Sequence, residues 1–262
     1  MRDIKEALRN DQVVIGVCND ISDPSAVEIL GDTGWDFVII NCEGGTMSIY
    51  GAELENQIRA AYIADVTPAV KVPKNDPAMI ASALNLGAKM IEVPGINTKE
   101  DIIAAVRAAK YPPLGNRMTC WGTPAQKYGA VPWPEFVRQS NEEVTIFAVL
   151  EEKEAMDNME EILSVEGLDV AGIGYLDLAL KLGGIDDPDI EAQVAEYGEK
   201  LLTLCKQKGV CMGKGVADVD AARAAIAAGC RFLWFGSDDA TMLRSASAKW
   251  VTDLRKVIKE LS

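Results

Sequence analysis

Two acidic residues, Glu151 and Asp177, have a type and spacing suited to chemistry. Glu151 directly follows an apolar run at residues 145–150, and Asp177 lies three residues past a second apolar run at 170–174. Both runs are short and bounded by turn residues, which predicts buried strands with an acid just past each C-terminal end. Carboxylates at the ends of neighbouring parallel strands can converge on one hard cation. The pair is the main chemical feature of the chain.

Composition narrows the classes of function. The chain has 262 residues, of which 48% are hydrophobic and 25% charged, enough for one large α/β domain. A net charge of −14 argues against binding to nucleic acid or to an anionic membrane, because both need a basic face. No apolar run approaches the ~18–20 residues of a membrane span, and residues 1–6 do not resemble a signal peptide. We therefore expect a cytoplasmic protein.

The chain contains no histidine. This excludes Ser/His and Cys/His triads and imidazole metal ligands. The six cysteines form no CxxC pair, so we expect reduced thiols and neither disulfides nor a zinc site. Proton transfer must therefore use a carboxylate, Lys, Tyr, Cys or bound water.

The alternation of strands and helices predicts the fold. Eight short strands are expected at 13–17, 35–40, 67–72, 89–93, 145–150, 170–174, 210–212 and 231–235. Eight or more helices separate them, which is typical of a (β/α)8 TIM barrel in a single domain over residues 1–262. A doubly wound open sheet would share this alternation, but no glycine-rich dinucleotide fingerprint follows the first strand.

In such a barrel, the residues just past each strand line the mouth of the active site. These are Asn41, Cys42, Glu43, Lys71, Pro94, Asn116, Arg117, Glu151, residues 174–177, Lys214 and residues 236–238. Any one polar residue at such a position is as readily explained by contact with water. The coincidence of two acids with cationic groups at one mouth favours a functional site.

Several motifs resemble the HpcH/HpaI aldolase family, and the resemblance runs from about Ile4 to the C-terminus. They are Val93-Pro94, the segments 111–117 and 127–129, Glu151-x-x-Glu154-Ala155-Met156, Ile173-Gly174-x-x-Asp177-Leu178 and Gly236-Ser237-Asp238. The resemblance implies a metal-dependent pyruvate-type aldolase, a lyase built on a TIM barrel, that acts on a small-molecule 2-oxo acid and an aldehyde.

The family pattern also implies roles for individual residues. Glu151 and Asp177 would bind a divalent cation, Mg or Mn, which chelates the carboxylate and ketone of the 2-oxo acid. Backbone N–H groups around Leu176 and Asp177, with Gly174 beside them, would hold the carboxylate. A cation next to the ketone oxygen stabilises an enolate.

The departures from the family pattern concern proton transfer. Asn41 and Gly44 stand where the family has an Asp and a His, Lys71 replaces an Arg, and Val149 replaces a Gln. The expected metal ligands are present while the acid/base pair is not. General acid–base groups contribute about 10²–10⁴-fold in rate, so some other group must substitute.

Glu43 and Lys71 are the predicted catalytic residues. Glu43 can act through water or support its neighbours, and Lys71 can act as a base if its pKa is lowered or as a carboxylate anchor. Cys42 is more readily a buried, inert thiol than a thiolate. Metal-bound hydroxide is the simplest base. The roles of three residues in the segment 111–134 remain open: Cys120, Lys127 and Tyr128. Arg117, in the same segment, is expected to be structural.

Three functions remain open. We prefer a carbon–carbon lyase that acts on a pyruvate-like 2-oxo acid through an enolate, with altered proton handling. The alternatives are a catalytically impaired binder of metal and 2-oxo acid, and a related enolate reaction such as a citrate-synthase-like condensation or a decarboxylation. The expected C-terminal helix at 239–261 carries an apolar stripe. It either packs on its own barrel or, as the resemblance suggests, exchanges between subunits of a homo-oligomer.

Overall fold

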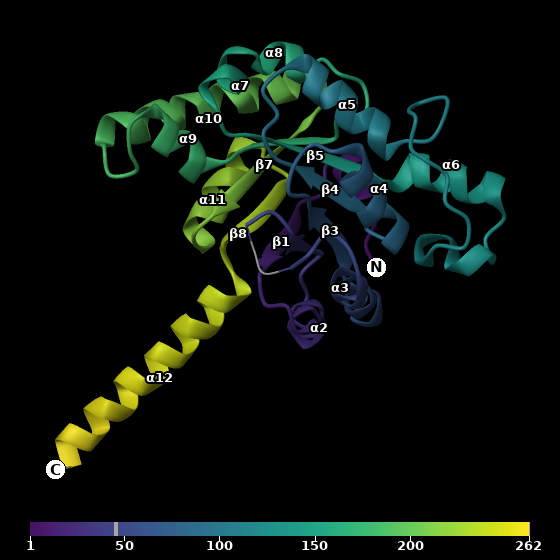
Figure 1. Ribbon diagram of the computed structural model, residues 1–262. Helices are drawn as coiled ribbons and strands as arrows, with labels where there is room; N and C mark the ends of the chain where they lie inside the picture. The colour runs from purple at the N-terminus through teal and green to yellow at the C-terminus, as the bar shows by residue number, and fades with distance from the viewer. Residues whose placement is uncertain (45–46, 262) are drawn as a thin grey trace.

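The computed structural model describes residues 1–44 and 47–261 (Figure 1). Eight parallel strands, hydrogen-bonded in sequential order, close into a barrel, which confirms the predicted TIM barrel. The strands are β1 (Val14–Asn19), β2 (Phe37–Asn41), β3 (Thr67–Lys71), β4 (Met90–Val93), β5 (Thr145–Leu150), β6 (Val170–Ile173), β7 (Cys211–Val216) and β8 (Phe232–Asp238).

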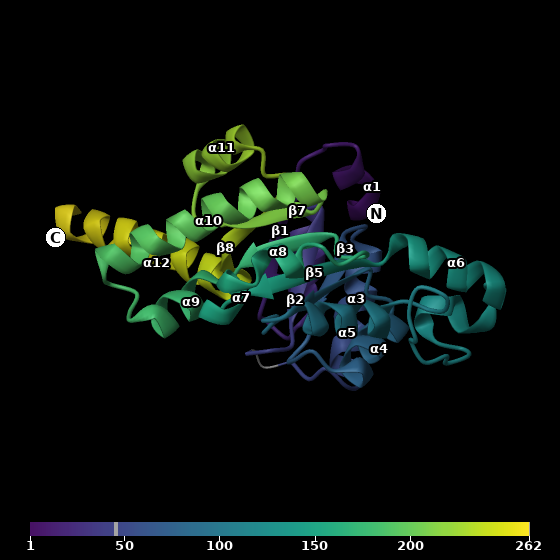
Figure 2. The same cartoon turned by 90° about the horizontal axis from the view of Figure 1, so that it is seen from above.

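Helices connect the strands and surround the barrel (Figures 1 and 2). They are α1 (Ile4–Arg9), α2 (Pro24–Asp32), α3 (Ala52–Ile63), α4 (Pro77–Leu86), α5 (Lys99–Ala109), the 3₁₀ helix η1 (Pro124–Gly129), α6 (Trp133–Glu143), α7 (Lys153–Asp157), α8 (Met159–Ile162), α9 (Tyr175–Leu182), α10 (Pro188–Lys208), α11 (Val219–Ala228) and α12 (Asp239–Leu261).

Two helical segments follow β5 and β6 closely. The segment after β5 is split into α7 and α8 at Asn158, whose backbone leaves the helical region (φ −97°, ψ 6°). The side-chain amide of Asn158 donates to the carbonyl of Asn97 at 2.9 Å, which gives the break a tertiary partner. Helix α9 begins directly after β6 and places Asp177 in its first turn.

Side chains alternate between the inside and the outside of the barrel, as the strand repeat requires. Phe37, Phe147 and Phe232 fill the interior, and the rings of Phe37 and Phe232 stack with centroids 4.5 Å apart. Trp234 fits beside them only because Gly172, Gly213 and Gly215 carry no side chain. A Cβ atom at each of these glycines would lie within 3.2 Å of the indole ring.

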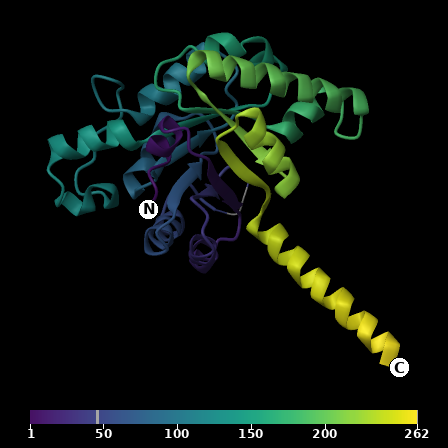
Figure 3. The same ribbon diagram turned by 180° about the vertical axis from the view of Figure 1, so that it is seen from behind.

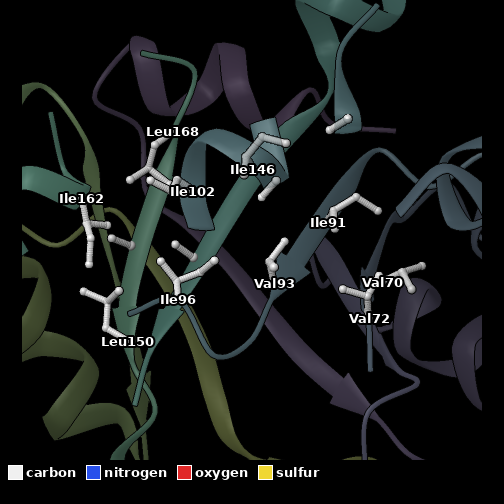
Figure 4. Close-up of a cluster of buried hydrophobic side chains, with 14 of the residues drawn as sticks. Val70, Val72, Ile91, Val93, Ile96, Ile102, Ile146, Leu150, Ile162 and Leu168 are labelled. Carbon is white, nitrogen blue, oxygen red and sulfur yellow. The ribbon is translucent and has the colours of Figure 1, made fainter. Parts of the chain in front are cut away.

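A larger apolar layer lies between the barrel and its helices (Figure 4). The outward residues of β3, β4 and β5 pack there against α5, α8 and the connecting segments. Figure 4 labels Val70, Val72, Ile91, Val93, Ile96, Ile102, Ile146, Leu150, Ile162 and Leu168 of this layer. Burial of these side chains holds the helices against the sheet and thereby fixes the strand ends.

An ion pair lies at the N-terminal end of the barrel. Lys5 of α1 approaches Asp169 at 2.8 Å, with side-chain exposures of 10% and 14%. Asp169 also accepts a hydrogen bond from the backbone N–H of Ile146 at 2.9 Å. The pair therefore ties the first helix to the starts of β5 and β6, on the face away from the expected active site.

Helix α12 extends away from the barrel (Figures 1 and 3). Asp239 at its start is buried, whereas Trp250, Leu254 and Leu261 are 70%, 55% and 84% exposed. Packing of this helix on its own barrel, one of the two expectations, is therefore wrong. Among the described residues, no helix is both long and apolar enough to cross a membrane.

We predict that Lys5→Met lowers the free energy of unfolding by about 2 kcal/mol, because it leaves a largely buried carboxylate without its cation. Urea denaturation followed by circular dichroism measures the change. Lys153→Met is the matched control, because its partner Asp157 is 60% exposed and the pair contributes little. Equal effects of the two substitutions would contradict the importance of the Lys5 pair.

Candidate active site

The interior columns of side chains change from apolar to charged at the C-terminal ends of the strands. Along β3 the inward positions are Ala69 and then Lys71, and along β4 they are Met90 and then Glu92. The same alternation on β5 carries the inward face from Val149 to Glu151. The top of the barrel is therefore lined by ionisable groups above a fully apolar interior.

Lys71 lies at the centre of this charged layer. Its ammonium forms an ion pair with Glu43 and lies 3.9 Å from Oε1 of Glu92. The strand register places Asn41 beside Lys71 and Lys71 beside Glu92. Both predicted catalytic residues, Lys71 and Glu43, are thus brought together at the mouth.

The charge state of Lys71 follows from these neighbours. Burial disfavours the ammonium, but the charge of Glu92, together with the hydrogen bond and charge of Glu43, raises the pKa of Lys71 to about 12. Among these neighbours Lys71 is a cation at neutral pH. The raised pKa disfavours a role for Lys71 as a general base and favours the alternative role as an anchor for anions.

Glu92 was not among the residues that we selected from the sequence. It is 7% exposed, and its Oε2 atom has no hydrogen-bond partner. Burial raises the pKa of Glu92 to about 7. The charge of Lys71 opposes this rise, and the charges of Glu43 and Glu151 add to it. One feature of the sequence could have indicated Glu92, because it is the one acidic residue in the apolar strand 90–93. Charged residues are rare in buried strands.

Glu151 lies at the end of β5, with a carboxylate that is held in place and only 8% of its surface exposed. Its Oε1 atom accepts a hydrogen bond from the N–H of Gly95 at 2.9 Å. Its Oε2 atom lies against Gly174, where a Cβ atom would come within 2.8 Å of it. Burial raises the pKa of Glu151, and the charges of Glu43 and Asp177 raise it further.

This donor set fits a divalent cation. Asp177, in the exposed first turn of α9, supplies a second carboxylate near Glu151. Within residues 1–44 and 47–261, no group of three or more His, Cys, Asp or Glu side chains is arranged to hold a metal ion. Mg²⁺ is usually bound by one or two carboxylates, and water and substrate oxygens fill its remaining coordination positions. A cation would also offset the repulsion that raises the pKa of Glu151.

The N-terminus of α9 is the predicted site for a substrate carboxylate. The N–H groups of Leu176 and Asp177 belong to the first turn, where they have no acceptor within the helix. The N–H of Gly174 donates instead to the carbonyl of Leu150 at 3.0 Å. Gly174 therefore contributes space beside Glu151 and leaves donation to the residues that follow it.

A further acid, Asp20, lies across the mouth at the end of β1. The side-chain amide of Asn41 donates to its Oδ1 atom at 2.8 Å. Burial raises the pKa of Asp20, and although the bond from Asn41 opposes this, the charges of Asp238 and Asp239 add to the rise. Sequence reasoning missed Asp20 because it ended the first strand at Val17.

Two residues expected at the mouth face outward. Cys42 packs in the apolar layer outside the barrel, and burial followed by the charge of Glu53 raises its pKa to about 12, which confirms an inert thiol. Lys214 lies between Met212 and Val216, both of which face the outer layer, and it interacts there with Cys230. Strand alternation directs its side chain away from the interior.

The segment before α6 contacts other helices. The guanidinium of Arg117 donates to Ser140 at 3.0 Å and to Asn85 at 2.7 Å, which confirms its structural role. The hydroxyl of Tyr128 accepts a hydrogen bond from Arg59 on α3 at 3.1 Å. Helix α6 lies on the opposite side of the molecule from α9 and α12 (Figures 1 and 2). None of these recorded contacts brings Cys120, Lys127 or Tyr128 to Glu151 or Asp177.

Comparison with known proteins identifies relatives over nearly the whole chain. The HpcH/HpaI aldolase/citrate lyase family matches residues 16–245. A 5-keto-4-deoxy-D-glucarate aldolase of Shigella dysenteriae is 31% identical over 256 residues, which cover 96% of each chain.

Solved structures with the same fold include members of that family. An HpcH/HpaI aldolase/citrate lyase family protein from Burkholderia cenocepacia superposes with a TM-score of 0.88 at 29% identity, over 97% of this chain and 100% of the other. The citrate synthase SbnG superposes with a TM-score of 0.84 at 26% identity, over 97% and 99% of the two chains. The similarity thus extends to proteins named for cleavage and for condensation.

We predict that Ellman's reagent labels one thiol of the native protein rapidly, and that Cys120→Ser abolishes this fast phase. Cys120 is exposed, whereas Cys42 is buried and its thiol pKa is raised to about 12. Cys42→Ser should leave the fast phase unchanged. Rapid labelling of Cys42 would show that its thiol is accessible and would reopen a role for it at the site.

Proposed function

The chain belongs to the HpcH/HpaI aldolase/citrate lyase family, and we propose that it makes or breaks a carbon–carbon bond next to a pyruvate-like 2-oxo acid. The observation that carries the proposal is that Glu151, at the end of β5, interacts electrostatically both with Asp177, in the first turn of α9, and with Lys71. Aldolase chemistry on this substrate class requires stabilisation of an enolate, which positive charge provides.

Glu151 and Asp177 are the proposed ligands of Mg or Mn. The cation supplies positive charge next to the ketone oxygen of the bound 2-oxo acid. The hydrogen bond from Gly95 fixes the rotamer of Glu151, so that its second oxygen stays directed toward the mouth. Asp177 is fixed by its place in the first turn of α9.

The carboxylate of the 2-oxo acid is proposed to bind at the start of α9, to the N–H groups of Leu176 and Asp177. Gly174 provides the room for its approach, because a side chain there would collide with Glu151. Lys71 adds a permanent positive charge on the neighbouring side of the mouth. As a compact ammonium, Lys71 attracts anions without the paired geometry of an arginine.

Glu43 is the proposed acid/base residue. In the cleavage direction it accepts the proton of the C4 hydroxyl, the electron pair of the C3–C4 bond passes to C3 of the pyruvate enolate, and the aldehyde leaves. Return of the proton to C3 yields pyruvate. The ion pair with Lys71 holds the side chain of Glu43 at the mouth, where its carboxylate can accept the proton. Asn41 and Gly44 carry no group able to perform this step at neutral pH.

A condensation of a 2-oxo acid with the enolate of a thioester is the alternative. The similarity to the citrate synthase SbnG supports it, because that reaction also passes through an enolate. A catalytically impaired binder is the remaining alternative. The binder differs from an aldolase in not enolising the 2-oxo acid. The condensing enzyme differs from an aldolase in the electrophile that it accepts.

Helix α12 is proposed to exchange between the subunits of a homo-oligomer. Beyond its first turn it extends away from its own barrel, and its apolar residues there are too exposed for an isolated chain in water. A second copy offers the same helix in return, so both apolar stripes are buried at once. We also propose a cytoplasmic location, which suits a negatively charged protein acting on small organic acids.

We predict that the protein with Mn²⁺ or Mg²⁺ exchanges the methyl protons of pyruvate for solvent deuterium, and that chelator abolishes the exchange. Glu151→Gln and Asp177→Asn should each lower the rate at least about 100-fold, because each removes a ligand of the cation. Proton NMR measures the exchange, and calorimetry measures Mn²⁺ binding separately.

Glu152→Gln is the control for these variants, because its carboxylate pairs at the surface with Lys181. It should retain both exchange and metal binding. Mn²⁺ binding without any exchange would contradict the enolate chemistry and support the binder. Binding of Mn²⁺ that persists in both ligand variants would contradict the assigned metal site.

We predict that Trp250→Asp, or removal of residues 240–262, lowers the molecular mass in solution measured by light scattering. Trp250 is 70% exposed on α12, and a charge there opposes burial in an interface. Lys249→Asp is the control, because its side chain is 78% exposed and pairs only with Asp253 of the same helix. An unchanged mass in all variants would contradict exchange of α12.

A further inference from the structure

We propose that the second substrate of this site is an aldehyde that carries no carboxylate or phosphate group. This inference rests on the proposed function, since it concerns the electrophile that an enolate formed at Glu151 and Asp177 would meet. It comes from the distribution of charge across the barrel mouth. The side that would face the 2-oxo acid and the side that would face the second substrate differ strongly in charge.

The barrel order determines what the second substrate faces. The proposed metal ligands follow β5 and β6, and strands β1 and β2 lie across the closed barrel from them, with β8 next to β1. A molecule that extends from the metal ligands over the mouth therefore reaches the ends of β1 and β2 and passes beside the end of β8. The ionisable or polar residues there include Asp238, Asp20, Asn41 and Glu43.

These strand ends supply negative charge and hydrogen-bonding groups. Asn41 directs its amide toward Asp20, and Asp20 interacts electrostatically with Asp238 and Asp239. Mutual repulsion contributes to a raised pKa of Asp20, as expected where carboxylates gather without enough positive charge. An anionic group placed beside them would meet the same repulsion.

The cation at the mouth is already engaged. Lys71 pairs with Glu43, lies 3.9 Å from Glu92, and also interacts with Glu151 and Asp20. In the described part of the chain, no other Lys or Arg forms an ion pair with Glu43, Glu92 or Glu151. Lys71 can attract one anion, the carboxylate of the 2-oxo acid, but has little charge left for another.

Glu92 supplies a second, independent observation. Its Oε2 atom is buried without a hydrogen-bond partner, and the residue lies beside Lys71 on the neighbouring strand. When ionised, Glu92 adds negative charge beside Lys71 at a cost in solvation. Even with a divalent cation bound, carboxylates outnumber positive charges, and the 2-oxo acid adds one more negative group.

The inferred preference differs from that suggested by the Shigella relative, whose named substrate is a derivative of a diacid. Groups that suit the mouth of this chain are hydroxyls and amides, which can donate to Asp20, Glu43 and Asp238. A cationic group would be tolerated for the same reason. A carboxylate would be disfavoured by Coulomb repulsion over several ångströms, which is worth about 10-fold or more in kcat/KM.

The test uses the full-length protein with Mn²⁺ and pyruvate in the direction of aldol addition. Matched aldehydes are succinic semialdehyde against its primary amide, and glyoxylate against glycolaldehyde. We expect kcat/KM to be at least about 10-fold higher for the uncharged member of each pair. Added salt should raise kcat/KM for the anionic members only, because it screens their repulsion.

The double variant Asp20→Asn with Asp238→Asn should lower the ratio of kcat/KM between the uncharged and the anionic aldehydes about 10-fold. Both amides keep the shape of the carboxylates and remove only their charge. Glu160→Gln, whose carboxylate pairs with Lys208 on the far surface, is the control and should not narrow it. An equal or greater preference for the anionic aldehydes, or no effect of the double variant, would overturn the proposal.

Pyruvate exchange, measured in the same sample without aldehyde, separates this inference from the proposed function. Retained exchange with a preference for anionic aldehydes overturns only the charge preference. Loss of exchange in the unmodified protein overturns both, because an electrophile preference presupposes the enolate.

Discussion

Closure of the parallel sheet is the constraint on which the rest of the structure depends. In a closed barrel every second residue must point inward, and the interior has room only for packed side chains. Phe37, Phe147 and Phe232 satisfy that requirement, and three glycines admit Trp234. The next inward positions, including Lys71, Glu92 and Glu151, reach the mouth with water on one side. A charged site is thus built directly on a rigid apolar support.

The electrostatics of the mouth follow from this placement. Burial raises the pKa of Glu151 and of Asp20, and neighbouring carboxylates raise each of them further. A divalent cation and a network centred on Lys71 are the two means of compensation that the residues allow. Without histidine, the proton transfer that we propose uses the carboxylate of Glu43, which the ion pair with Lys71 holds in position.

The relatives and the geometry bear on different parts of the function. Membership of the HpcH/HpaI aldolase/citrate lyase family establishes the class of enzyme over nearly the whole chain. The structure adds the pairs of side chains at the barrel mouth, where Asn41 pairs with Asp20 and Glu43 pairs with Lys71. We propose that those pairs govern proton transfer and the choice of electrophile.

The sequence by itself determined the barrel, because the apolar runs of its strands and the spacing of its helices are local patterns. It also singled out Glu151, Asp177, Lys71 and Glu43 as candidates through their places at strand ends. Only the tertiary structure decided which way Cys42 and Lys214 face, since a strand end one residue earlier or later reverses the side chain. It alone revealed Glu92 and Asp20, and it alone separated α12 from its barrel, because burial and charge depend on residues far apart in the chain.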